Sequence, residues 1–263
     1  MNKRELLDRT GADGEERLLL GQVLDKMEHA QRRQEPCATG FLSPKEQRSA
    51  EALLNAAGHP RYAAVGGYDG AERRVLVFLP DWMEPEYLQS GDYLSVLRCT
   101  WFKEDKLTHR DFLGSFLGLG VNRDAVGDII VTGDGAYIYC LPSVAEFAAL
   151  NLTKVGRAGA KTERVSLDAV PVKEIKKKEI KFSVMSPRLD AAVSGMFNLS
   201  RATASKLIDS GLVSLNYKEC LKSDKEVREG DIISARGYGK GVIKEQGGTS
   251  RRGRTFISAD IFK

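Results

Sequence analysis

The stretch that decides the fold runs from Ser186 to Gly239 and reads SPRLDAAVSGMFNLSRATASKLIDSGLVSLNYKECLKSDKEVREGDIISARGYG. Ser200 stands where a helix N-cap belongs, because its hydroxyl can accept a hydrogen bond from a free amide of the first turn, and Gly211 is placed to end the helix. This predicts a helix over 201–210. A buried stripe at i, i+3 and i+4 spacing supports it, formed by Ala204, Leu207 and Ile208.

Two short apolar runs after this helix predict strands. They cover 212–215 and 231–235, and a turn at Asn216 and Tyr217 follows the first of them. We therefore expect two short helices packed on a small sheet.

Basic residues of the same stretch predict a phosphate site. Arg201 lies at the helix start, where free amides and the positive end of the helix dipole attract an anion. Lys206 and Arg236 add charge, and the glycines beside Arg236 leave backbone amides open to close approach. Each basic side chain taken alone could equally be an ordinary solvated charge, but their combination favours a nucleic-acid backbone.

These residues together resemble the S4 RNA-binding domain, named after a ribosomal protein. The resemblance rests on Arg188-Leu189-Asp190, Ser200-Arg201, Ala204, Leu207-Ile208, Gly211, Val213, Asn216, Gly230-Asp231 and Arg236-Gly237. It implies a structural role for Asp190 and contacts with structured RNA for Arg188, Ser200, Arg201, Lys206, Asn216, Lys218, Arg236 and Lys240. Lys240 stands where an arginine is common in the family, which keeps the charge but loses the planar fork.

Charge is unevenly distributed along the 263 residues. From Pro171 to Lys263 there are 19 Lys and Arg against 11 Asp and Glu, an excess of eight positive charges. Because the net charge of the chain is +4, the residues before Pro171 carry a net charge of −4. The C-terminal part is therefore the one expected to bind a polyanion.

The remaining composition excludes several classes of protein. The four cysteines, Cys37, Cys99, Cys140 and Cys220, form no C-x-x-C pair, so we expect reduced thiols and neither a zinc site nor a disulfide framework. The N-terminus lacks an apolar signal core, and no apolar run is long enough for a membrane span. We expect a cytoplasmic protein with no membrane partner, no metal and no cofactor.

The pattern before the basic part changes from helical to strand-like near residue 60. Helices are expected over 15–33 and from Ser43-Pro44 to about Ala57. Strands over 75–79 and 93–102 follow, then a helix over 109–117 capped by Thr108 with Asp111 and a hairpin of 128–131 with 136–140. A capping box of Ser143 with Glu146 begins a last helix to about Asn151.

These elements predict an α+β chain with four parts: an N-terminal helical segment (1–60), an RNA-recognition-like, ferredoxin-like middle domain (61–170), a basic linker (171–180) and an S4-type domain with a basic tail (181–263). Cofactor loops are not indicated. His109-Arg110-Asp111 lacks the asparagine and glycine-rich loop of a kinase, and Gly114, Gly118 and Gly120 do not stand between a strand and a helix.

Nearly the whole chain resembles the YlmH family of bacterial RNA-binding proteins. The resemblance rests on Leu42-Ser43-Pro44 with Glu46-Gln47, Gly66-Gly67-Tyr68 with Ala71-Glu72-Arg73, His109-Arg110-Asp111-Phe112-Leu113-Gly114, Gly118-Leu119-Gly120 and Gly127-Asp128-Ile129. It implies binding of rRNA and tRNA on the large ribosomal subunit, with a role in quality control of stalled nascent chains and no small-molecule substrate.

A second RNA surface is possible outside the S4 pattern, formed by Arg110, Arg123, Arg251, Arg252 and Arg254. Alternatively, Arg110 and Arg123 tie the helix to the sheet through Asp111 and Asp128, and this structural interpretation is slightly preferred.

The competing class is an RNA-modifying enzyme, a pseudouridine synthase or an rRNA methyltransferase that uses an S4 domain to bind its substrate. Arg188-Leu189-Asp190 even mimics a pseudouridine synthase motif. It lies inside the binding domain, however, and the sequence has no glycine-rich methyl-donor loop after a strand. A non-catalytic binder with no catalytic residues is therefore expected.

Overall fold

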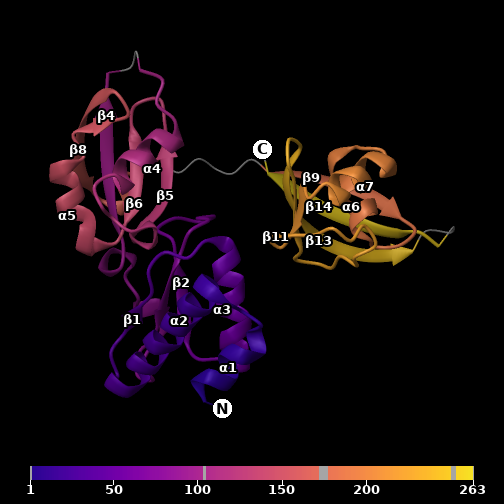
Figure 1. The fold of residues 1–263 in the computed structure, drawn as a ribbon, viewed down its shortest axis with the longest axis horizontal. Coiled ribbons are helices and arrows are strands. Elements are labelled where there is room, and N and C mark those ends of the chain that lie inside the picture. Colours follow the sequence, from indigo (N-terminus) through magenta and orange to yellow (C-terminus); the bar gives the residue numbers. More distant parts are fainter. Residues whose placement is uncertain (1, 103–104, 172–176, 250–252, 263) are drawn as a thin grey trace. The chain divides into compact units, whose positions relative to one another are not determined.

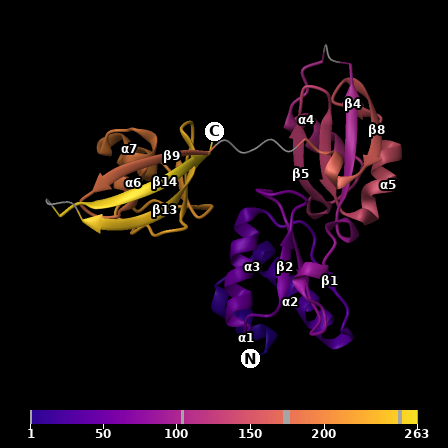
Figure 2. The same cartoon turned by 180° about the vertical axis from the view of Figure 1, so that it is seen from behind.

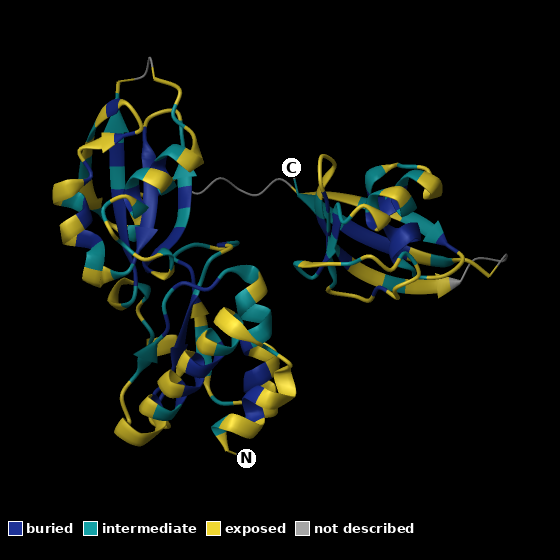
Figure 3. Ribbon diagram, viewed as in Figure 1, coloured by how far each residue is buried: buried dark blue, intermediate teal, exposed yellow. Residues whose placement is uncertain are grey.

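The computed structural model describes residues 2–102, 105–171, 177–249 and 253–262. The chain forms two compact units, Met1–Val172 and Lys173–Lys263, each with a core of its own. In both units the buried residues gather on the strands and on the inner sides of the helices (Figure 3).

Three helices and a small antiparallel sheet form the N-terminal part of the first unit (Figure 1). The helices are α1 (Lys3–Thr10), α2 (Gly14–Arg33) and α3 (Pro44–Ala56), and the sheet has the order β1-β3-β2, with β1 (Cys37–Ala38), β2 (Tyr62–Val65) and β3 (Val75–Phe78). The helices bury a common core against Leu76 and Phe78 of β3. The limit of the helical segment was expected at residue 60, but this sheet joins β1, before that residue, to β2 and β3, after it.

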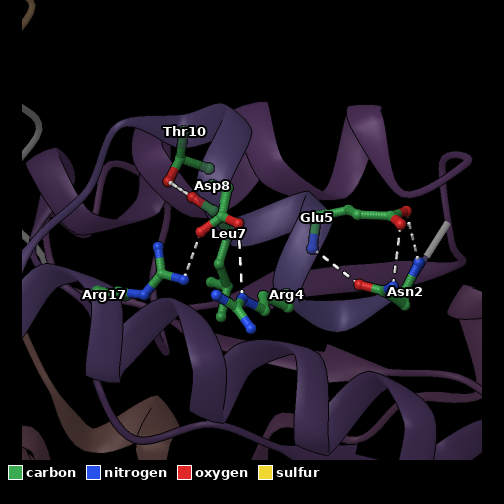
Figure 4. Close-up of polar contacts among 7 residues, drawn as sticks. All are labelled: Asn2, Arg4, Glu5, Leu7, Asp8, Thr10 and Arg17. Atoms are coloured by element: carbon green, nitrogen blue, oxygen red, sulfur yellow. Dashed lines mark hydrogen bonds and ion pairs between the residues drawn. The ribbon is translucent and has the colours of Figure 1, made fainter.

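Side-chain caps explain where the first and third helices begin. Asn2 accepts a hydrogen bond from the Glu5 amide at 2.9 Å, and Glu5 accepts one from the Asn2 amide at 3.2 Å (Figure 4). Ser43 and Glu46 form the same reciprocal box, with Pro44 at the first helical position. The helix predicted from Ser43-Pro44 is thus confirmed together with its cap.

The middle of the first unit has the chain order β-α-β-β-α-β-β. Its elements are β4 (Ser95–Trp101), α4 (His109–Leu117), β5 (Val126–Val131), β6 (Ala136–Cys140), α5 (Pro142–Asn151), β7 (Lys154–Val155) and β8 (Ala158–Val165). The antiparallel sheet has the order β5-β6-β4-β8-β7. One face packs against both helices, through Phe112, Phe116, Ala145 and Ala148.

The other face of this sheet is largely covered by the N-terminal part of the same unit. Tyr137 and Tyr139 of β6 are 4% and 0% exposed, and they pack in one cluster with Val75, Val77 and Phe41. The helix-free face of an RNA-recognition fold stacks bases on exposed aromatic rings. Here the two rings on β6 are buried in the core instead.

The second unit packs two helices on one face of a six-stranded antiparallel sheet (Figures 1 and 2). Its elements are β9 (Lys177–Val184), α6 (Leu189–Phe197), α7 (Arg201–Asp209), β10 (Val213–Leu215), β11 (Lys218–Glu219), β12 (Ile232–Ala235), β13 (Gly239–Thr249) and β14 (Thr255–Phe262). The sheet order is β11-β10-β12-β13-β14-β9. The core joins Ala192, Ala204 and Ile208 of the helices to Ile233 and Ile257 of the sheet.

Most expected elements are confirmed, including the helix from Arg201, the hairpin of β5 and β6 and the strands β10 and β12. One cap was wrong: α5 has Leu141 as its N-cap and Pro142 at its first position, so Ser143 lies inside the helix. Proline favours that first position because its missing amide would be unbonded there anyway. Part of the expected linker, from Lys177 onward, is strand β9, which pairs with β14 along its whole length.

Among the described residues, no helix is long and apolar enough to cross a membrane. Cys99 and Cys140 are buried free thiols, and Cys37 and Cys220 are half-buried free thiols. Burial raises the pKa of the Cys140 thiol to about 12.

Candidate nucleic-acid interface

Asp190, in the first turn of α6, holds two of the predicted RNA-binding arginines. Its carboxylate accepts hydrogen bonds from Nε and Nη2 of Arg188, both at 3.2 Å, and from Nη2 of Arg201 at 2.9 Å. The amide of Ala191 donates a fourth bond at 2.8 Å. The side chains of Arg188 and Arg201 are 40% and 57% exposed, whereas that of Asp190 is 7% exposed. The buried carboxylate therefore fixes two guanidinium groups that solvent can still reach.

The surroundings keep Asp190 charged. Burial alone would raise the pKa of this carboxyl, but the hydrogen bonds from Arg188 and Arg201 and the charge of Arg201 together lower it below its ordinary value. An ionised Asp190 orients both arginines, in agreement with the structural role that the resemblance implies.

The start of α7 lies beside this pair of arginines. Ser200 is the N-cap, and its hydroxyl accepts a hydrogen bond from the Thr203 amide at 3.1 Å. Arg201 is the first residue of the helix, so its charge adds to the positive end of the helix dipole. Lys206 is exposed five positions later, about 140° further round the helix, and therefore does not lie on the side of Arg201.

A second group of predicted residues gathers at the hairpin of β10 and β11. Asn216 and Tyr217 form its two-residue turn, with φ angles of 54° and 64°, as a type I′ turn requires. The Asn216 side chain donates to Asp231 at 2.6 Å and accepts from the Ile232 amide at 2.9 Å. Its amide group is therefore engaged within the protein and fixes the turn that presents exposed Lys218.

Arg236 and Lys240 flank the turn between β12 and β13. Arg236 is exposed, and Gly237 after it has a φ of 85°, which explains the glycine at this position. The Lys240 ammonium lies over two rings, 6.0 Å from the centroid of Tyr217 and 5.4 Å from that of Phe262. The predicted residues thus form a group around Asp190 and a group around the two turns, with Lys206 apart.

The residues of the possible second surface lie in different surroundings. Arg110 is exposed on α4, whereas half-buried Arg123 donates to the Val126 carbonyl at 2.6 Å. Burial, followed by the nearby charge of Arg73, lowers the pKa of Arg123. Arg254 donates to the Ser183 carbonyl at 2.6 Å, and Arg251 and Arg252 lie outside the described residues.

In the part of the chain that the structure describes, the hydrogen bonds of Asp111 and Asp128 are not to Arg110 or Arg123 but to other residues. Asp111 accepts hydrogen bonds from the amide and the hydroxyl of Thr108, at 2.8 and 2.7 Å, as expected for the cap of α4. Asp128 accepts bonds from the Tyr68 hydroxyl at 2.8 Å and from the amides of Glu72 and Arg73 at 2.7 and 3.1 Å. Asp128 therefore anchors the loop after β2 to the middle sheet.

The sequence did not predict this joint, the contact between the N-terminal part and the middle domain of the first unit. The Arg73 guanidinium donates to the carbonyls of Val126 and Phe41, at 2.9 and 2.8 Å, and so spans both parts of the unit. Gly127 allows the close approach, because a Cβ there would lie 2.5 Å from the Phe41 ring. The signal was present in Gly66-Gly67-Tyr68, Ala71-Glu72-Arg73 and Gly127-Asp128, but no local pattern shows that these segments meet.

Among the described residues, no group of three or more His, Cys, Asp or Glu side chains is placed to hold a metal ion.

The fold and the exposed arginines are those of an S4 domain, which follows a larger α+β unit in the chain. Three family models match the chain: "YlmH, N-terminal" over residues 15–82, "Putative RNA-binding domain in YlmH" over residues 100–169 and "S4 domain" over residues 187–233. Together they support an RNA-binding role.

The chain belongs to the YlmH family. It is 30% identical over 239 residues to the "Ribosome-associated protein quality control protein P2" of Bacillus subtilis (strain 168), a match that covers 90% of this chain and 92% of that protein. A solved structure, "Cell division protein ylmH from Streptococcus pneumoniae", is similar at a TM-score of 0.49 and 23% identity, over 60% of this chain and 94% of that one. The predicted family, its S4 domain and the α+β class are confirmed.

Proposed function

We propose that this chain is a non-catalytic protein of the cytoplasm that binds structured RNA, rRNA or tRNA, on the large ribosomal subunit. Its work there is quality control of stalled nascent chains. The proposal is supported by the S4 domain and by the similarity to a relative named for ribosome-associated protein quality control.

The observation that carries the proposal is the arrangement of Arg188 and Arg201 on Asp190. A surface arginine normally loses side-chain entropy when it binds a phosphate. Here both guanidinium groups are already oriented by one carboxylate, and the free donors of their forks can face a phosphate. The first-turn amides of α7, capped by Ser200, add a further site for negative charge.

The same geometry disfavours the enzyme alternative at Arg188-Leu189-Asp190. A carboxylate that attacks a base must be open to the substrate. The Asp190 side chain is 7% exposed and accepts four hydrogen bonds from its own domain. Detection of a modified nucleotide in rRNA or tRNA that depends on this protein would nevertheless overturn the non-catalytic part of the proposal.

Salt dependence of RNA binding tests the site. We expect Arg201→Ala to weaken binding to purified large subunits and to reduce the slope of log K against log salt by about 0.9, the value for one lost phosphate contact. Arg228→Ala is the matched control, because Arg228 is 79% exposed in the same domain and pairs only weakly, with Glu226 at 3.3 Å.

An Arg201→Ala variant that kept the slope of the original chain would contradict the site assignment. Crosslinking in cells, followed by sequencing of the attached RNA, tests the target. Recovery of 23S rRNA and tRNA is expected, and recovery of only unrelated RNA would reject the ribosomal part.

A further inference from the structure

The helix-free face of the S4 sheet carries a row of lysines and aromatic rings. Across the sheet, Lys177 pairs with Phe262, and Phe262 pairs with Lys240. Gly241, next to Lys240, faces the helices, because a Cβ there would lie 2.6 Å from Met196 of α6. Successive side chains of a strand point to opposite faces, so Lys177, Phe262 and Lys240 lie on the face away from α6 and α7.

The rings and the ammonium groups of this row alternate in space. The Lys240 ammonium lies between the rings of Tyr217 and Phe262, at 6.0 and 5.4 Å from their centroids, and the Lys177 ammonium lies 6.0 Å from the Phe262 centroid. These distances are within the range of a cation–π contact. The contacts keep the ammonium groups of the long lysine side chains beside half-buried rings. Positive charge and flat apolar surface therefore lie next to each other.

Acidic groups of the next row are already neutralised. Glu179 and Asp260 follow on the same face, and Lys244 lies 3.6 and 3.8 Å from their carboxylates. Glu179 also pairs with Lys181, whose ammonium lies 3.5 Å from its carboxylate. Lys244 and Lys181 therefore offset the carboxylates that lie next to the row of Tyr217, Lys240, Phe262 and Lys177.

We infer that this row is a second RNA site of the S4 domain, and that it binds an unpaired segment of the RNA. The inference rests on the proposed RNA-binding function. Proteins bind single strands by stacking bases on aromatic side chains while cations contact the backbone phosphates. Bases of a duplex are already stacked on one another and cannot use the rings. The domain thus holds structured RNA through the two arginines on Asp190 and a single strand on its helix-free sheet face.

Two labelled RNAs test the inference with the full-length chain: an oligouridine of about 12 nucleotides, within the range of known single-strand sites, and a stable hairpin with a short loop. The variant combines Lys177→Ala with Phe262→Leu, which removes one charge and one ring but keeps an apolar side chain in β14. We expect about tenfold weaker oligouridine binding by fluorescence anisotropy, a salt slope smaller by about 0.7, and unchanged hairpin binding.

Lys178→Ala is the matched control, because Lys178 is the next residue of β9, pairs with Ile261 and points to the opposite face. It removes the same charge, and oligouridine binding should stay as in the original chain. Unchanged oligouridine binding by the double variant, or an equal loss on both RNAs, would overturn the inference. If the original chain bound the hairpin but not oligouridine, the inference alone would fail, whereas binding of neither RNA would reject the proposed function itself.

Discussion

At the scale of single residues, the chain uses carboxylates to fix positions rather than to react. Asp190 organises Arg188 and Arg201, and Asp128 anchors a loop through three hydrogen bonds. Burial, and then the charge of Asp128 and its hydrogen bond, raises the pKa of Tyr68, so the Tyr68 hydroxyl stays protonated and remains the donor. The resemblance implied that Asp190 is structural, but the hydrogen bonds of Asp128 to the Tyr68 loop were not predicted, because this loop is distant in sequence.

Asp190→Asn should change the acid stability of the second unit. The pKa of Asp190 is lower in the folded state than the value of about 3.9 in the unfolded chain. Its contribution to stability is therefore fully present above that unfolded value and is lost as the pH falls through the folded pKa.

We expect the Asn variant to lose about 1–3 kcal/mol of the free energy of unfolding at pH 7, since two arginines lose a charged acceptor. The loss should shrink towards pH 3. Urea unfolding followed by far-UV circular dichroism across this pH range measures it, and an equal loss at pH 3 and pH 7 would contradict the assignment.

Gly127→Ala should destabilise the first unit. The new methyl group would lie 2.5 Å from the Phe41 ring and 3.0 Å from Cβ of Tyr139, so the joint must shift. We expect a cost of about 1–3 kcal/mol in the free energy of unfolding, measured by urea denaturation. Gly133→Ala is the control: among the described residues, no heavy atom beyond its chain neighbours lies within 4 Å of its Cβ position. Equal stability of the two variants would speak against a tight joint.

At the scale of elements, caps and strand patterns correctly predicted the helices and hairpins that neighbouring residues determine. The helix from Arg201 and the hairpin of β5 and β6 followed from caps and strand patterns, and both are present. The start of α5 was misplaced because Ser143 with Glu146 fits a capping box as well as a helix interior. Pro142 occupies the first helical position, which places the pattern in the interior. The start of β9 within a lysine-rich run depends on pairing with β14, far along the chain, which no window of sequence contains.

The turn of β10 and β11 can be tested at Asn216. Its positive φ suits Asn and Gly, and its side chain makes two hydrogen bonds. Asn216→Gly should therefore lose only the bonds, whereas Asn216→Ala should lose the bonds and also strain the backbone. We expect stability to fall in the order Asn, Gly, Ala, with a total cost of about 1–3 kcal/mol for Ala. Urea unfolding of the three chains gives the order, and an Ala variant as stable as the Gly variant would refute it.

At the scale of the whole molecule, each unit has its own core, and the cores share no residues. In the S4 part, short-range caps and turns predicted α7, β10 and β12, whereas β9 and β13, which pair with β14, were not predicted. It did not show that the N-terminal part and the middle domain bury one common cluster around Phe41 and Tyr139, since that cluster joins distant segments. The burial of Tyr137 could not be foreseen either, because exposed and buried tyrosines follow the same strand pattern.

The two units should unfold separately. Both tryptophans, Trp82 and Trp101, belong to the first unit, so tryptophan fluorescence reports only on that unit, while far-UV circular dichroism reports on both. We expect the two urea transitions not to coincide, since coincident transitions are the mark of two-state unfolding. A substitution in the S4 core, Ile208→Ala, should shift only the dichroism curve. A shift of the fluorescence curve by this variant would show that the units unfold as one.

The shared cluster of the first unit also sets an order of events during synthesis. Val75 and Val77 leave the ribosome about 60 residues before Tyr137 and Tyr139, which complete their burial. At about 5–20 residues per second, the early strands wait for about 3–12 s with an apolar face uncovered. A chain cut short between β3 and β6 would keep that face open permanently, so such a fragment should be a substrate for chaperones and proteases.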